Sequence, residues 1–295
     1  MLLRILGIVF PVFAIIAAGW FYARYKRRHG GIDMAFANQL NMDVFVPALI
    51  FAALATKHLD LAAYDELALA ALAVLLGSGL AGWGIARLLG EQPKTLAPPM
   101  MFVNSGNMGL PLLVLAFGEA ALPAAVVLFL IENTLHYTLG VWLLDHRARL
   151  ATLWRVPVTL AAIAALAVNL AGIEIWPPLY LAIKLLGDIA VPLLLFSLGV
   201  RLALSKLSDL RIGLIAMVAR PVVGMLLAVA VGWAMGLTER DAAMLLVFGA
   251  LPAAVLNYVF AERYHQEPGK VASIVMIGNL GALIFIPIAL SLTLK

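Results

Sequence analysis

The hydrophobic positions of the chain form long continuous runs separated by short polar stretches. A membrane-spanning helix needs about 20 mostly apolar residues, because a rise of about 1.5 Å per residue must cross a core of about 30 Å. The runs do not alternate as the strands of a membrane β-barrel do. They predict an all-α polytopic membrane protein with ten transmembrane helices, at 5–23, 36–56, 67–89, 97–117, 121–144, 157–176, 178–202, 212–236, 241–261 and 270–292.

The composition strengthens this prediction. The 295 residues are 64% hydrophobic and 12% charged, with no Cys, whereas a soluble domain carries about 25% charged residues. These values exclude a soluble enzyme, a disordered protein and a disulfide scaffold. The net charge of +4 comes from Lys and Arg between the apolar runs, and it therefore indicates membrane topology rather than a nucleic-acid partner.

Lys and Arg are distributed unequally between the two sides of the membrane. The loops after the odd-numbered spans carry fourteen of them and the opposite side carries four. The positive-inside rule makes the richer side cytoplasmic, so both termini are expected outside the cytoplasm. Residues 1–19 also fit a secretory signal, but Arg24, Lys26, Arg27 and a partner segment later in the chain favour a retained first helix.

The two halves of the chain resemble each other. Asp43–Phe51 matches Asp188–Phe196 at an offset of 145, and three shorter matches follow the same order: Pro11 with Pro157, Leu110-Pro111 with Leu251-Pro252, and Asn133 with Asn279. We predict two five-helix repeats, residues 1–150 and 151–295. Because five is odd, the second copy enters the membrane from the opposite side. Inverted repeats of this kind are typical of secondary transporters that work by alternating access.

Gly and Pro interrupt the fourth and ninth spans at corresponding places. Glycine permits unwinding and proline removes a backbone donor, so both spans are predicted to break near mid-membrane. The half-helix N-termini that result favour an anion, and Asn amides add neutral donors. The reading of the prolines as tolerated kinks is weaker for this matched pair. The predicted substrate-binding residues are Asn104, Ser105, Gly106, Asn107, Gly109, Pro111, Gly249, Pro252 and Asn257.

Glu132 and His136 are the first candidates for ion or proton coupling, because charge within a membrane is costly and usually functional. They lie four residues apart on one helix face, with Asn133 beside them. A buried carboxylate here could carry a proton. The alternative is a local hydrogen bond that steadies the helix.

Three further ionisable residues within the spans are candidates for the same role. Asp43 and Asp188 occupy the same position in each repeat, which favours a shared function, although capping of the loops explains them equally well. Asp188 also lies four residues after Lys184 and could simply neutralise it. Arg220 lies deep in the eighth span and could balance an anionic substrate or pair with a carboxylate.

Other chemistry is weakly represented in the sequence. The five His residues show no zinc spacing, and neither a catalytic triad nor a phosphate-binding Walker motif is evident. We expect no metal site, no enzyme activity and no ATP-driven transport. No cofactor is expected apart from a coupling ion, H⁺ or Na⁺.

The stretch Asn104–Leu112, together with Asn41–Phe51 and Pro192–Gly199, resembles the auxin efflux carrier family. This family includes the plant PIN-formed auxin exporters and bacterial malate and malonate permeases. The likeness covers the whole chain and is closer to the bacterial permeases, because only residues 145–156 join the halves. It implies a scaffold domain of helices 1, 2, 6 and 7 and a transporter domain of helices 3–5 and 8–10.

The resemblance also implies a substrate site. In the family, the broken fourth and ninth helices cross and Asn residues hold the substrate carboxylate. By position this role falls on Asn104 or Asn107. The second half lacks an Asn before Pro252, and Asn257 follows it.

The sequence therefore predicts a permease-like secondary transporter that moves a small organic anion by elevator-like alternating access. The expected partners are that anion and the lipid bilayer, with no nucleic acid; a homodimer through the scaffold domain stays open. The expected location is the bacterial inner membrane. The alternatives are a Na⁺-coupled carrier similar to the bile-acid/sodium symporters and a non-transporting membrane sensor.

Overall fold

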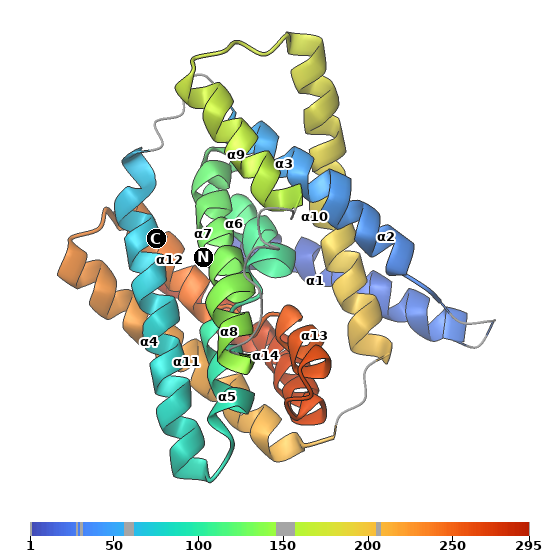
Figure 1. Cartoon of the computed structure of the whole chain (residues 1–295), viewed down its shortest axis with the longest axis vertical. Helices are drawn as coiled ribbons and strands as arrows, with labels where there is room; N and C mark the ends of the chain where they lie inside the picture. Colours follow the sequence, from blue (N-terminus) through green and yellow to red (C-terminus); the bar gives the residue numbers. More distant parts are fainter. Residues whose placement is uncertain are drawn as a thin grey trace.

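The computed structural model describes residues 2–27, 29, 32–55, 62–145, 157–204 and 208–294. Every regular element within these ranges is a helix (Figure 1), so the all-α prediction is confirmed there. The α-helices are α1 (Leu2–Arg27), α2 (Ala35–Leu40), α3 (Val46–Leu54), α4 (Asp65–Leu89), α5 (Pro93–Met101), α6 (Leu110–Phe117), α7 (Leu122–Leu135), α8 (Val141–Leu144), α9 (Pro157–Leu170), α10 (Pro177–Leu204), α11 (Leu210–Met235), α12 (Glu239–Ala250), α13 (Leu256–Arg263) and α14 (Pro268–Thr293). Wider π-helical turns, η1 (Asn41–Phe45), η3 (Ser105–Gly109) and η5 (His136–Gly140), continue some of them without a break in direction.

Seven helical segments in the described ranges are long and apolar enough to cross a membrane, fewer than the ten spans expected. Two of the missing spans, the fourth and the ninth, are each divided into two shorter helices. The third is α9, whose 14 residues reach only about 21 Å. The seven segments are Leu3–Arg27, Ala35–Leu54, Asp65–Leu89, Glu119–Leu144, Pro177–Leu204, Leu210–Met235 and Pro268–Thr293.

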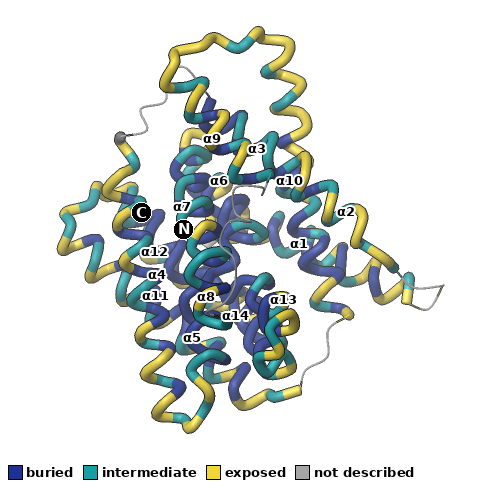
Figure 2. The backbone as a smooth tube through the Cα atoms, viewed as in Figure 1, coloured by how far each residue is buried: buried dark blue, intermediate teal, exposed yellow. Residues whose placement is uncertain are grey.

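Burial differs strongly among these helices. Buried residues make up 67% of the most apolar window of α14 but only 28% of that of α11. Figure 2 shows the buried positions concentrated in the middle of the molecule, with exposed ones on the outer helices. Large apolar side chains such as Leu88, Leu226 and Trp233 are exposed. A water-soluble surface rarely carries so much exposed apolar area, whereas lipid accommodates it. The protein is therefore an integral membrane protein.

The helices make their closest contacts through glycines. On α10, Gly199 packs so tightly against α1 that a Cβ atom built there would lie 1.9 Å from the carbonyl oxygen of Ile16. Gly224 of α11 and Gly249 of α12 meet in the same way, with 2.1 Å from such a Cβ to the Gly249 oxygen. Small residues at helix crossings are typical of membrane bundles, in which van der Waals contact replaces the hydrophobic effect.

The two divided spans meet at their interruptions. Phe102–Asn104 separates α5 from η3 and α6, and Leu251–Val255 separates α12 from α13. Val103 and Ala253 form an antiparallel bridge: Asn104 N–H donates to Pro252 O at 2.8 Å, and Ala254 N–H donates to Phe102 O at 3.0 Å. These bonds satisfy main-chain groups that lipid would leave unpaired.

The first interruption does not fall at the matched proline. Pro111 lies in the first turn of α6, several residues past the break, whereas Pro252 lies within its own break. η3 runs directly into α6, so Pro111 lies inside one helical segment, Ser105–Phe117, and the wider π-helical turn just before it accommodates its missing N–H donor.

Candidate functional site

A cavity of about 270 Å³ borders the place where the two interrupted helices meet. One side is formed by α2, η1, α3 and α10, and the other by η3, α7, η5 and the second interruption with the start of α13. Most of the lining is apolar, with a limited set of polar groups, as is usual for small-molecule sites. The polar residues that border it are Asn38, Asn41, Asn104, Asn107, Glu132, Asn133, His136, Tyr137, Ser197 and Arg201.

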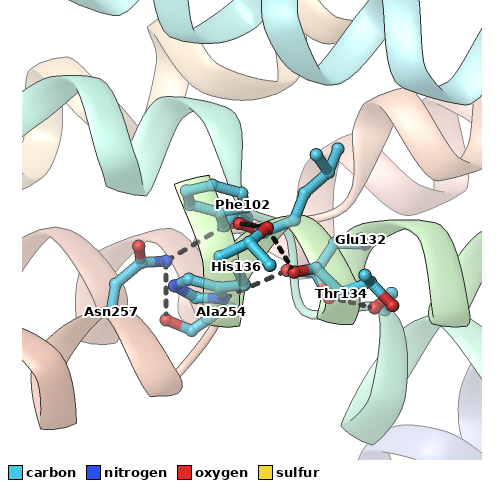
Figure 3. A network of polar contacts seen from close by, with 9 residues as sticks. Phe102, Glu132, Thr134, His136, Ala254 and Asn257 are labelled. Carbon is cyan, nitrogen blue, oxygen red and sulfur yellow. Dashed lines mark hydrogen bonds and ion pairs between the residues drawn. The ribbon is translucent and has the colours of Figure 1, made fainter. Parts of the chain in front are cut away.

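Three buried Asn side chains hold the interruptions together. Asn104 Nδ2 donates to Asn279 Oδ1 at 2.8 Å, and Asn279 Nδ2 donates to Ala253 O at 3.1 Å. Asn257 Nδ2 donates to Phe102 O at 3.1 Å and to Ala254 O at 3.0 Å (Figure 3). The amide donors of Asn104 and Asn257 are thus used within the protein.

Asn107 differs from these three. It lies in η3, is half-buried and borders the cavity. Among the described residues, none makes a hydrogen bond with its side chain. Of the three Asn residues predicted to bind the substrate, Asn104, Asn107 and Asn257, Asn107 is therefore the one whose amide makes no hydrogen bond to a described residue.

The backbone beside Asn107 is suited to an anion. Ser105 begins η3 and Leu256 begins α13, and Gly106 and Leu256 in these first turns border the cavity. Some of the first-turn N–H groups are already bonded, because Ser105 N–H donates to Val103 O, and the N–H groups of Asn257 and Tyr258 donate to Ala254 O and Val255 O. The remaining first-turn N–H groups carry the partial positive charge of a helix start. Glycine permits close packing beside them: a Cβ on Gly106 would lie 3.0 Å from the Phe129 ring, and one on Gly109 would lie 2.8 Å from Leu251 Cδ1.

Glu132 links this half-helix to α7. Its Oε2 accepts a hydrogen bond from Ser105 Oγ at 2.8 Å, and its Oε1 lies 3.2 Å from His136 Nδ1. The His136 ring stacks on Phe102 with centroids 4.1 Å apart (Figure 3). It also meets the Phe260 ring edge-on. Glu132 and His136 are 3% and 2% exposed. An ionisable pair is therefore in direct contact with the start of η3 at the cavity.

Arg220 lies outside this cavity. It is 2% exposed on α11, and its Nη1 donates to Gly249 O in the last turn of α12. A cation is favourable there, because the carbonyl end of a helix carries partial negative charge. Nε and Nη2 have no hydrogen-bond partner among the described residues. Arg220 borders instead a cavity of about 10 Å³ together with Pro252 and Ala253.

The structure separates Asp43 and Asp188 from the cavity. Both are exposed, and neither borders it. Asp188 pairs with Lys184 at 2.9 Å, one helical turn away. This local pair is the neutralising alternative that the sequence left open for Asp188. Gly249, which the sequence also proposed, contributes a close helix contact and an acceptor for Arg220 rather than part of the lining.

Six polar residues at or beside the cavity were missed by the sequence: Asn38, Asn41, Tyr137, Ser197, Arg201 and Asn279. Asn279 could have been found, because it matches Asn133 in the repeat. Asn41 lies within the segment that carries the family likeness, but its position gives no chemical signal. Ser197 and Arg201 gave none either, since Arg201 counts as a loop cation until α10 is seen to continue to Leu204.

The form of the molecule, apolar helices around a polar cavity at two interrupted helices, is that of a membrane transporter. The profile of the family described as "Membrane transport protein" matches residues 4–152 and 148–290. The chain belongs to this family, and the likeness to the auxin efflux carriers is confirmed. It is a transport protein and not an enzyme.

A particular relative covers nearly the whole chain. The protein named "Putative malonate transporter" of Rhizobium meliloti (strain 1021) is 27% identical over 303 residues. The match covers 94% of this chain and 92% of the relative.

Proposed function

We propose that the protein is a secondary carrier that moves a small carboxylate anion across the membrane by elevator-like alternating access. The observation that carries the proposal is the pairing of the two interruptions through Val103 and Ala253 beside the cavity. This pairing brings two half-helix N-termini and the amide of Asn107 to one place. Neutral donors and helix dipoles bind a carboxylate without a buried countercharge of their own.

The proposed architecture is a pair of inverted five-helix repeats, residues 1–150 and 151–295. In space, α1–α3 with α9 and α10 form the scaffold domain, and α4–α8 with α11–α14 form the transporter domain. The contacts support this division, because α10 packs on α1 and α3, whereas α11 packs on α4, α12 and α14. Figure 1 shows α1 and α10 on one side of the view and α4 and α11 on the other. The cavity lies between the two groups, where relative motion would open it to either side.

The substrate class proposed is a small dicarboxylate similar to malonate. The name of the Rhizobium relative supports this class, and so does the size of the cavity. A single substrate molecule of this size occupies such a cavity, and its carboxylates then contact the lining. Discrimination then depends on which lining groups meet each carboxylate.

The cavity is proposed to face the cytoplasm. Asn38 lies near the start of its span, and Tyr137, Arg201 and Val259 lie toward the ends of theirs. Each of these helix ends leads to a loop on the side rich in Lys and Arg. The proposed location is the bacterial inner membrane, with both termini outside the cytoplasm. Dimerisation through the scaffold domain is part of the proposal, and the exposed apolar face of α10 is compatible with it.

Coupling to H⁺ is proposed through Glu132. Its carboxylate contacts both Ser105 at the start of η3 and His136, so a change in its protonation alters the hydrogen bonds at the substrate site. Coupling to Na⁺, as in the bile-acid/sodium symporters, would need carboxylate oxygens around a free ion position. The Glu132 oxygens already contact Ser105 and His136, which favours the proton.

Uptake by purified protein in liposomes tests the proposal. Labelled malonate should accumulate in vesicles that contain the wild-type protein, more strongly with an inward proton gradient, and not in empty vesicles. The matched control is protein with Asn107→Ala at equal density. If none of a panel of mono- and dicarboxylates enters the vesicles, the protein is not a carrier of this class, and the result favours the alternative of a non-transporting membrane sensor.

A further inference from the structure

An apolar cavity of about 370 Å³ lies between α1 and α10 on one side and η3 and α14 on the other. Except for Asn279, its lining consists of aliphatic, aromatic and methionine side chains. Both amide atoms of Asn279 are already bonded, Oδ1 by Asn104 and Nδ2 to Ala253 O. The cavity therefore suits a hydrocarbon and not a carboxylate, whose burial without donors is costly. Leu280 and Leu283 in the lining are exposed, so the cavity opens on the surface that meets lipid.

The face that α1 turns to this cavity continues as a row of cations. Phe13, Ala17 and Trp20 line the cavity. Arg24 and Arg27 follow at the same alternating spacing of three and four residues, which places all five on one side of the helix. The stripe therefore changes from apolar to cationic in the last turns of α1, which ends at Arg27.

Arg24 lies directly beside the cavity. Its Cζ is 4.9 Å from the centre of the Trp20 ring, and Trp20 belongs to the lining. A guanidinium over an aromatic ring keeps its in-plane N–H groups for hydrogen bonds to phosphate oxygens. Within the part of the chain that the structure describes, no carboxylate pairs with Arg24 or Arg27. Both are exposed, so their charge is directed to a partner outside the chain.

We propose that this site binds one anionic phospholipid, with an acyl chain in the apolar cavity and the phosphate at Arg24 and Arg27. The order of the stripe, apolar side chains, then Trp20, then two cations, is the order of acyl chain, interface and phosphate in a phospholipid. Tryptophan is enriched at this depth of a membrane, and basic residues just beyond a span attract anionic lipids.

The place of the cavity gives this lipid a role in transport, and this part of the inference rests on the proposed function. In the proposed elevator, η3 and α14 move past α1 and α10, and the cavity crosses that boundary. Met108 on η3 and Asn279 on α14 belong to the moving side of its lining. An acyl chain fills this boundary without directional bonds that movement would have to break. We therefore expect the lipid to raise the transport rate.

The chain contains a matched pair of residues on α4. Arg87 Cζ lies 5.8 Å from the centre of the Trp83 ring, four residues earlier, and both side chains are exposed near the end of their helix. Trp83 does not line the 370 Å³ cavity. Substitution of Arg87 therefore measures the general attraction of a basic helix end for anionic lipid, without the cavity.

Native mass spectrometry of the purified full-length protein, titrated with phosphatidylglycerol or phosphatidylcholine of the same acyl chains, provides the test. The wild type should bind one phosphatidylglycerol about tenfold more tightly than phosphatidylcholine, because each of two basic residues favours the anionic lipid. Arg24→Gln combined with Arg27→Gln should remove this preference, and Arg87→Gln should keep it. Ala17→Phe should occupy the cavity and weaken the binding of both lipids. Ala18→Phe, at the exposed neighbouring position outside the lining, should bind as the wild type does.

Two results would overturn the lipid site. One is a double Arg variant that loses no more of the preference than Arg87→Gln, because the cations at the cavity would then have no special role. The other is equal binding of phosphatidylglycerol by Ala17→Phe and Ala18→Phe, because the acyl chain would then lie elsewhere. A thermal scan shows that each variant is folded, and Leu283→Trp, from the exposed side of the cavity, serves as a second variant that fills it.

Uptake of malonate tests the effect on transport separately. Vesicles of phosphatidylcholine are compared with vesicles of phosphatidylcholine and phosphatidylglycerol in equal parts. The wild type should be faster in the mixed vesicles, whereas the double Arg variant should be equally fast in both. Equal wild-type rates in the two kinds of vesicle would refute the role in transport. If the wild type takes up no malonate in either, the proposed function fails, while the binding measurement still decides the lipid site.

Discussion

Asn104 and Asn279 are 175 residues apart in the chain, yet Asn104 Nδ2 donates to Asn279 Oδ1 at 2.8 Å. Asn279 lies on α14 and also contacts the second interruption, since its own Nδ2 donates to Ala253 O. One side chain therefore fixes both breaks to a continuous helix. A residue that does not border the 270 Å³ cavity therefore links the two interruptions beside it.

Removal of this connection should destabilise the protein. Asn279→Ala leaves Asn104 Nδ2 and Ala253 O without their buried partner, and each unsatisfied group costs about 1–3 kcal/mol. We expect a clear fall in the thermal unfolding temperature in detergent. Asn38→Ala is the matched control, because Asn38 borders the cavity outside this network. Equal stability of the two variants would contradict a structural role for Asn279.

Asn107 should behave in the opposite way. Asn107→Ala should abolish malonate binding and leave the unfolding temperature within about one degree of the wild type, because no described residue depends on its amide. Asn107→Asp should be equally inactive, since the negative charge of the introduced carboxylate repels the anionic substrate. Calorimetry and a thermal scan on the same preparation check this. Unaltered uptake by Asn107→Ala would remove it from the substrate site.

Glu132 is predicted to set the pH dependence of transport. Glu132→Gln keeps an acceptor for Ser105 Oγ but removes the titrating group. Malonate uptake by this variant should no longer respond to a proton gradient, while exchange of internal for external malonate continues. Uptake is measured across a series of imposed gradients. A gradient response equal to that of the wild type would assign coupling to another group.

The contact between α11 and α12 should tolerate no side chain. Gly224→Ala would place a methyl group 2.1 Å from the Gly249 carbonyl oxygen, so the helices must separate and the Arg220 contact with that oxygen is disturbed. We expect a loss of about 2 kcal/mol, typical of overpacking. Gly84→Ala on α4 is the control, because a Cβ there meets nothing within 4 Å and alanine favours a helix. It should be neutral or stabilising by about 0.5 kcal/mol.

The connection before α14 should respond to acid. Glu267 accepts a hydrogen bond from Thr95 Oγ1 and pairs with Lys270, which also pairs with Glu91 at 2.7 Å. Partial burial raises the pKa of Glu267, but the bonds from Lys270 and Thr95 more than offset this and hold its pKa below the usual range. A lowered folded-state pKa adds stability above the ordinary pKa of a Glu, and this stability is lost as the pH falls through the folded value.

Glu267→Gln should therefore lose about 1 kcal/mol at pH 7 and nothing at a pH below both pKa values. Unfolding temperatures between pH 3 and 7, about the ordinary pKa of 4.3 for Glu, measure this convergence. Glu66→Gln, at an exposed position, is the control and should run parallel to the wild type. Parallel curves for Glu267→Gln would show that the Thr95 and Lys270 contacts do not persist in solution.

Hydropathy predicts the helices of this chain well, because each continuous apolar run must satisfy its backbone internally in lipid. The interruptions were also predictable in outline, since Gly and Pro weaken a helix wherever they occur. Their position was not. Asn104 lies at the first break because its N–H donates to Pro252 O, and the local sequence does not reveal a partner so distant in the chain. For that reason the matched Pro111 did not indicate where the first break falls.

Part of the candidate site was also predictable from the sequence. Glu132, His136 and Asn107 stand out because polar residues are rare within apolar runs. Arg201 does not, because a cation near the end of a span is the ordinary signal of topology. Only the fold shows that α10 carries this residue to the border of the cavity.

The bridge between Val103 and Ala253 has a consequence for the chain as a whole. If the chain were divided into residues 1–150 and 151–295, the first piece would carry an unpaired N–H at Asn104 and an unpaired carbonyl at Phe102 into hydrocarbon. The second piece would carry an unpaired carbonyl at Pro252 and an unpaired N–H at Ala254. Each piece therefore supplies the hydrogen-bond partners that the other needs. Split genes that encode the two pieces should yield a working permease only when both are expressed in the same cell.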